Sequence, residues 1–73
     1  MMSKIPNLKP DRVIRTIKRA GFEVKEGARH TIVIRNDQII TMVPRGSKVI
    51  KKGTLSGIIK DLGMTLEEFK TYL

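Results

Sequence analysis

The sequence predicts an α+β domain in which a three-stranded antiparallel sheet has helices packed on one face. Apolar residues recur with a helical period near both ends of the chain, and three short β-rich stretches separated by turn residues occupy its middle. The expected order is helix, strand, strand, strand, helix, followed by a short last helix. The 73 residues suffice for a single domain, 1–73, in which residues 1–8 form a loose N-terminal arm.

The first helix is expected to begin at Pro10 and to end at Gly21. Proline fits the first turn of a helix, and glycine commonly follows the last turn. At 100° per residue, one face of this helix is apolar and carries Val13, Ile17 and Ala20. The opposite face is cationic and carries Arg12, Arg15 and Arg19. Such a face is either a solvated surface or a surface that binds phosphates.

Three stretches have the residue types typical of strands: 22–25, 30–35 and 38–43. A turn at residues 26–29 separates the first two. Asn36 and Asp37 separate the last two and form the expected two-residue hairpin turn, because both residue types tolerate the positive φ that this turn requires. Pro44 ends the third strand, since proline cannot donate to the ladder.

The hairpin turn sets the register and therefore the face of the sheet on which His30 lies. Counted outward from Arg35 opposite Gln38, an uninterrupted ladder places His30 opposite Val43. The more apolar face is expected against the helices and comprises His30, Ile32, Ile34, Ile39, Thr41 and Val43. The other face exposes a small apolar patch for a partner or a second copy, formed by Val33, Ile40 and Met42. His30 is thus expected at the edge of the core.

A basic loop over residues 45–53 follows the sheet and contains Arg45, Lys48, Lys51 and Lys52. The second helix, 54–62, is expected to bury Leu55, Ile58, Ile59 and Leu62. Thr65 and Glu68 have the spacing of a capping box, which predicts the start of the last helix. Its expected anchors in the core are Leu66, Phe69 and Leu73.

The charge of the chain indicates a polyanionic partner. Fifteen Lys and Arg stand against seven Asp and Glu, which gives a net charge of +8 at pH 7. Residues 1–20 carry six cations and one anion, so the excess is unevenly distributed. Nucleic acid is the favoured partner, because each neutralised phosphate releases a counterion. An anionic membrane surface is the competing one, although no apolar run is long enough to span a bilayer; we expect a cytoplasmic protein.

The chain has one histidine and no cysteine, so neither a disulfide framework nor a transition-metal cage is expected. Metal-free RNA cleavage needs a group that moves protons near neutral pH, and imidazole is best suited to this. The expected register places His30 near three cations that could hold the phosphate, Arg29, Arg45 and Lys48. The RNA 2′-hydroxyl would be the nucleophile, and no cofactor is needed. The alternative is a half-buried imidazole that only packs against its neighbours.

Several motifs follow one another in an order that resembles a known family. They are residues 19–22 (Arg-Ala-Gly-Phe), 27–30 (Gly-Ala-Arg-His), 43–44 (Val-Pro), 50–55 (Ile-Lys-Lys-Gly-Thr-Leu) and 62–65 (Leu-Gly-Met-Thr). Over nearly its whole length the chain resembles the HicA-type mRNA interferases, the toxin half of a bacterial or archaeal toxin–antitoxin pair. The resemblance implies a fold like that of a double-stranded-RNA-binding domain (dsRBD).

The resemblance also implies functional residues and partners. The family's catalytic histidine falls on His30, at the end of a Gly-Ser-x-His pattern in which Ala28 replaces the serine. Gly46 stands where many members have a second histidine. The implied activity is metal-independent endonucleolytic cleavage of mRNA, and the implied protein partner is a HicB-type antitoxin that covers His30 and the basic surface. A non-catalytic RNA-binding module and a protein-interaction adaptor for an acidic partner remain as alternatives.

Overall fold

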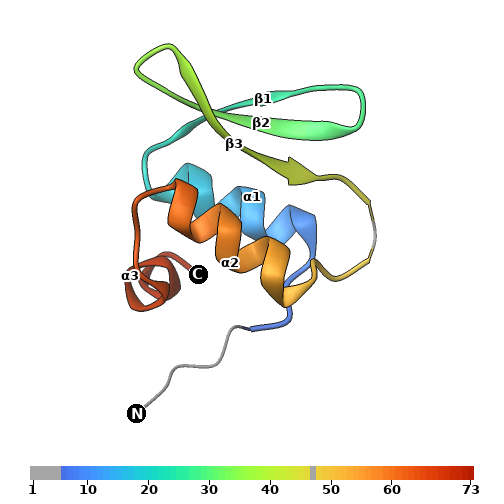
Figure 1. Cartoon of the computed structure of the whole chain (residues 1–73), viewed down its shortest axis with the longest axis vertical. Helices are drawn as coiled ribbons and strands as arrows, with labels where there is room; N and C mark the ends of the chain where they lie inside the picture. Colours follow the sequence, from blue (N-terminus) through green and yellow to red (C-terminus); the bar gives the residue numbers. More distant parts are fainter. Residues whose placement is uncertain (1–5, 47) are drawn as a thin grey trace.

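The computed structural model describes residues 6–46 and 48–73 and confirms the α+β class (Figure 1). The elements are α1 (Pro10–Arg19), β1 (Glu23–Glu26), β2 (His30–Arg35), β3 (Gln38–Pro44), α2 (Lys52–Asp61) and α3 (Leu66–Thr71). The strands form one antiparallel sheet in the order β1-β2-β3. Figure 1 shows α1 and α2 side by side against one face of the sheet, with α3 beyond the end of α2.

The local signals act as predicted. Pro10 occupies the first turn of α1, and Gly21 follows the helix with a φ of +94°. Asn36 and Asp37 have φ values of +52° and +62°, as a primed two-residue hairpin turn requires. The capping box at α3 is complete, because the Thr65 hydroxyl accepts from the Glu68 N–H and the Glu68 carboxylate accepts from the Thr65 N–H. Some element bounds differ by one or two residues: α2 begins at residue 52 instead of 54, β1 spans 23–26 instead of 22–25, and β3 includes Pro44.

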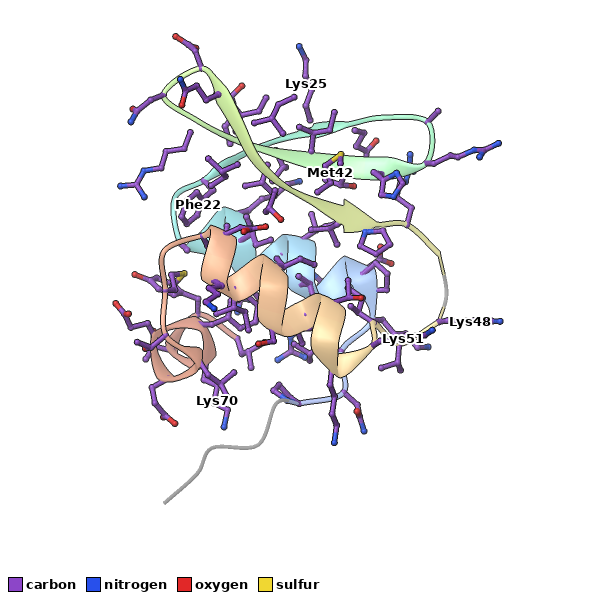
Figure 2. The ribbon with its side chains drawn as sticks, in the orientation of Figure 1. Phe22, Lys25, Met42, Lys48, Lys51 and Lys70 are labelled. Carbon is purple, nitrogen blue, oxygen red and sulfur yellow. The ribbon has the colours of Figure 1, made fainter. Side chains whose placement is uncertain are left out.

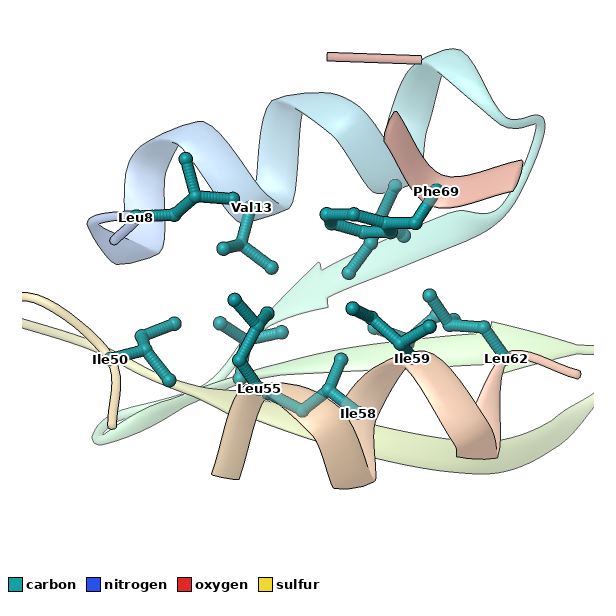
Figure 3. Close-up of a cluster of buried hydrophobic side chains, with 11 residues drawn as sticks. Leu8, Val13, Ile50, Leu55, Ile58, Ile59, Leu62 and Phe69 are labelled. Atoms are coloured by element: carbon teal, nitrogen blue, oxygen red, sulfur yellow. The ribbon is translucent and has the colours of Figure 1, made fainter. Parts of the chain in front are cut away.

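The core lies between the sheet and the helices (Figure 3). Its members are Leu8, Val13, Ile17, Val33, Val43, Ile50, Leu55, Ile58, Ile59, Leu62 and Phe69. Leu8 corrects the expectation of a loose arm over residues 1–8, since its side chain is buried and its carbonyl accepts from the Ile50 N–H at 2.8 Å. Residues 1–5 of that arm lie outside the described part of the chain. No described helix is both long and apolar enough to cross a bilayer.

A β-bulge in the second hairpin overturns the expected register. Arg35 pairs with Gln38 and Ile34 with Ile39, but Val33 pairs with Thr41, so Ile40 has no partner on β2. Beyond the bulge every pair is shifted by one residue, and His30 faces Pro44 instead of Val43. A shift of one residue exchanges the two faces of a strand, because side chains alternate along it.

The shifted register reverses the predicted orientation of β2. Thr31 and Val33 are buried against the helices, whereas Ile32 and Ile34 on the other face are only partly buried and His30 is exposed. The expected apolar patch is therefore wrong in its membership. Val33 is in the core and Ile40 packs against it, and the exposed apolar side chains of β3 are Ile39 and Met42.

Candidate functional site

His30 is the first residue of β2 and lies on the face of the sheet opposite the helices. Its side chain is exposed, and the next residue, Thr31, points into the core. The imidazole therefore is open to solvent and not at the core edge that the sequence predicted. This position lets a ligand reach the ring without any rearrangement of the core.

Gly27 holds the turn that precedes His30. Its N–H donates to the His30 carbonyl at 2.8 Å and closes the β1–β2 hairpin. A Cβ atom built on Gly27 would also lie 2.8 Å from that same carbonyl oxygen, which is closer than real Cβ atoms come to backbone atoms. Only glycine fits here without a shift of the backbone. The sequence motif contains this glycine, but the reason for it is visible only in three dimensions.

Arg45 connects this turn to the chain that follows β3. One Nη atom of its guanidinium donates to the Gly27 carbonyl at 2.7 Å, and its backbone N–H donates to the Arg29 carbonyl at 3.3 Å. Both bonds join segments that are sixteen or more residues apart in the sequence. They bring Arg29, His30 and Arg45 to one end of the sheet, where all three side chains are exposed.

A cleft of about 630 Å³ adjoins this end of the sheet, between the start of α1, the end of β3 and the start of α2. Three cationic side chains line it: Arg45, Lys48 and Lys51. Its other described lining residues are Pro10, Pro44, Gly46, Val49, Ile50 and Thr54, so none carries a negative charge. Figure 2 shows Lys48 and Lys51 on the same side of the molecule, along the chain that connects β3 to α2. Lys52 follows directly as the first residue of α2 and is exposed.

The arginines of α1 are exposed as predicted but extend away from the cleft. Pro10 lines the cleft, and at 1.5 Å per residue Arg15 and Arg19 lie about 8 Å and about 14 Å further along the helix axis. Arg15 lines a shallow hollow together with Asp11 and Glu26. Arg19 donates to the Tyr72 carbonyl at 3.4 Å, beside α3. Arg12, two residues from Pro10, is the α1 arginine nearest to the cleft in sequence.

The described part of the chain offers acid–base and cationic groups at this site. Across residues 6–46 and 48–73, no three His, Cys, Asp or Glu side chains gather into a group that could hold a metal ion. His30 can exchange a proton, and the surrounding guanidinium and ammonium groups can bind phosphate oxygens. This combination suits a phosphodiester ligand.

A family model whose description is HicA toxin of bacterial toxin-antitoxin matches residues 10–64. The matched segment runs from the first residue of α1 to just beyond α2 and includes His30, its hairpin and the whole described cleft. No curated protein matches the chain.

Proposed function

The chain belongs to the HicA toxin family of bacterial toxin–antitoxin systems, and from this premise we propose that it is a metal-independent endoribonuclease that cleaves mRNA. The observation that carries the proposal is the exposed histidine at the end of the sheet, next to a cationic cleft. Gly27 is hydrogen-bonded both to the His30 carbonyl and to the Arg45 guanidinium, which keeps these residues at the same end of the sheet. Family membership supports the role of a toxin, and the geometry supports the reaction that we assign to it.

In the proposed reaction, the His30 imidazole removes the proton of an RNA 2′-hydroxyl. The 2′-oxygen forms a bond to the adjacent phosphorus, and the bond from phosphorus to the 5′-oxygen of the next nucleotide breaks. The products are a 2′,3′-cyclic phosphate and a free 5′-hydroxyl. Because the chain has a single histidine, the imidazolium formed in the first step is the proton source for the departing 5′-oxygen.

The negative charge that develops on the phosphate is stabilised by Arg29, Arg45 and Lys48. One Nη–H of Arg45 donates to the Gly27 carbonyl, but a guanidinium has five N–H donors, so others remain for phosphate oxygens. Lys51, Lys52 and Arg12 extend the cationic surface toward neighbouring phosphates. Arg15 and Arg19 lie further along α1 and contribute long-range attraction of the RNA.

We also propose a HicB-type antitoxin as the protein partner. It would cover His30 and the basic surface, and a partner with acidic groups there would complement the +8 charge of the toxin. The exposed apolar side chains of β3, Ile39 and Met42, offer contact area to such a partner or to a second copy in a homodimer. The site of action would be the cytoplasm, where mRNA is present.

The proposal is tested by incubating single-stranded RNA with the purified protein and its His30→Ala variant in EDTA. The wild-type protein is expected to cleave, and loss of the imidazole is expected to slow cleavage by at least about 100-fold. Lys25→Ala is the matched control, because Lys25 is exposed in β1 and its partner Ile32 lies two residues from His30. Equal cleavage by wild type and His30→Ala, or none by either, would refute the enzymatic function.

The second candidate is a non-catalytic RNA-binding module. It is favoured by Ala28 and Gly46, both exposed, which supply neither the hydroxyl nor the second imidazole of the family pattern. This candidate predicts salt-sensitive RNA binding without any strand scission. A protein-interaction adaptor predicts affinity for an acidic protein and none for RNA.

A further inference from the structure

The cleft beside His30 has a composition that binding of a phosphate alone does not explain. Its cations, Arg45, Lys48 and Lys51, come from the chain between β3 and α2. Its walls are formed by two prolines and two aliphatic side chains: Pro10, Pro44, Val49 and Ile50. Val49 remains 46% exposed, although burial of a valine side chain away from water is favourable. The lining therefore suits a ligand that is both apolar and anionic.

We propose that this cleft binds one unpaired nucleotide of single-stranded RNA, the neighbour of the nucleotide that is cleaved at His30. The base packs against the prolines and Val49, and the flanking phosphates lie on the cations at the rim. The inference rests on the proposed function, because it takes the ligand of the site to be RNA. Beyond that function, the inference specifies the path of the RNA backbone past His30 and states that the recognised RNA is unpaired.

The position of the cleft relative to His30 supports this assignment. Pro44 lines the cleft and is the β3 partner of His30, and the Cα atoms of antiparallel partners lie about 4.5–5.5 Å apart. The cleft thus begins next to the residue that would meet the scissile phosphate. A nucleotide whose backbone passes His30 can place its neighbour's base in the cleft without a gap in the chain.

The size and chemistry of the cleft suit a single nucleotide. A volume of about 630 Å³ is within the range of small-molecule sites, which are mostly apolar with a few convergent polar groups. Thr54, in the first turn of α2, supplies a hydroxyl that can both donate to and accept from a base edge. Because a base in the cleft must leave its stack, the RNA bound here is single-stranded.

The test is a titration of the ¹⁵N-labelled full chain, followed by NMR, with each of the four nucleoside 3′-monophosphates and with inorganic phosphate. We expect the nucleotides to shift the amide signals of Val49, Ile50 and Thr54 and, because the base buries apolar surface in the cleft, to bind roughly tenfold more tightly than phosphate. Single-stranded RNA should displace the nucleotide, and a duplex should not.

Two matched variants assign the effect to the apolar wall. Val49→Ser should weaken nucleotide binding by roughly threefold to tenfold and leave phosphate binding unchanged. Ile39→Ser is the control, because it removes an exposed aliphatic side chain from β3 that does not line the cleft. Both positions are exposed, so neither variant opens a cavity in the core.

Three results would overturn the inference. They are equal binding of phosphate and nucleotides, equal loss in the two serine variants, and displacement of the nucleotide by polyglutamate more readily than by single-stranded RNA. The last would mark the cleft as a surface for an acidic protein. If the protein binds nucleotides in the cleft but never cleaves RNA, the proposed nuclease activity is refuted and the proposed binding site is supported. Failure of the binding site and failure of the nuclease activity can therefore be told apart.

Discussion

Replacement of Thr31 by valine is expected to stabilise the protein although it removes a hydroxyl group. Thr31 follows His30 in β2, is 1% exposed, and its Oγ1 has no hydrogen-bond partner among the described residues. Valine has nearly the same shape and replaces the hydroxyl by a methyl group. The substitution therefore removes a buried polar group that gains nothing from its surroundings.

The magnitude follows from the desolvation of that hydroxyl. An unpaired buried polar group costs about 1–3 kcal/mol, and the added methyl group gains further apolar burial, so the free energy of unfolding should rise by about 1–2 kcal/mol. For a domain of 60–100 residues, 1 kcal/mol shifts the melting temperature by about 4–8 °C. Thr31→Val should therefore raise the melting temperature by at least about 4 °C.

Differential scanning calorimetry and urea unfolding measure this change, and Thr16→Val is the matched control. Thr16 is equally buried, but its hydroxyl donates to the Arg12 carbonyl at 2.7 Å. Its replacement should be neutral or destabilising by up to about 1 kcal/mol. In an uninterrupted ladder Thr31 would lie on the exposed face, where valine changes little. An unchanged or lowered melting temperature for Thr31→Val would therefore refute both the inward orientation of Thr31 and the outward orientation of His30.

Other predictions test the turn, the caps and the charges. Gly27→Ala should lower the melting temperature and the rate of RNA cleavage together, because its Cβ would lie 2.8 Å from the His30 carbonyl; a variant as stable and active as wild type would contradict this. Asp37→Gly should stabilise by about 0.5 kcal/mol in urea unfolding, since glycine accepts the φ of +62° without strain. Thr65→Ala should cost about 1 kcal/mol in the same assay, because the capping box is lost. Arg45→Gln should reduce the slope of log affinity for single-stranded RNA against log salt by roughly 0.7, whereas Arg15→Gln, beside Asp11 and Glu26, should change it less.

Element types and order could be predicted from the sequence because their signals are local. Pro10, the Asn36-Asp37 turn and the Thr65 capping box each act within a few residues, and the structure confirms all of them. The helical period also identified most of the core. Leu8 was missed because its contacts, among them the backbone hydrogen bond from Ile50, are with residues distant in the sequence, which no local pattern predicts.

The face of the sheet could not be predicted, because hydropathy favoured the wrong one. On β2 the outer face contains Ile32 and Ile34, whereas the inner face contains Thr31 and Val33, so the more apolar face is not the buried one. The two consecutive isoleucines of β3 allow either register, and in the structure Ile40 is the bulged residue and packs against the core. His30 was correctly placed near the basic segment, but its exposure follows from this bulge.

The bond between the Arg45 guanidinium and the Gly27 carbonyl makes the two loops one structural unit. Exchanging the 45–51 connection for that of another chain, as in loop grafting to alter RNA preference, would also detach the turn before His30 unless the graft keeps arginine as its first residue. Diversity in a library of such grafts is best confined to residues 48–51, downstream of this anchor.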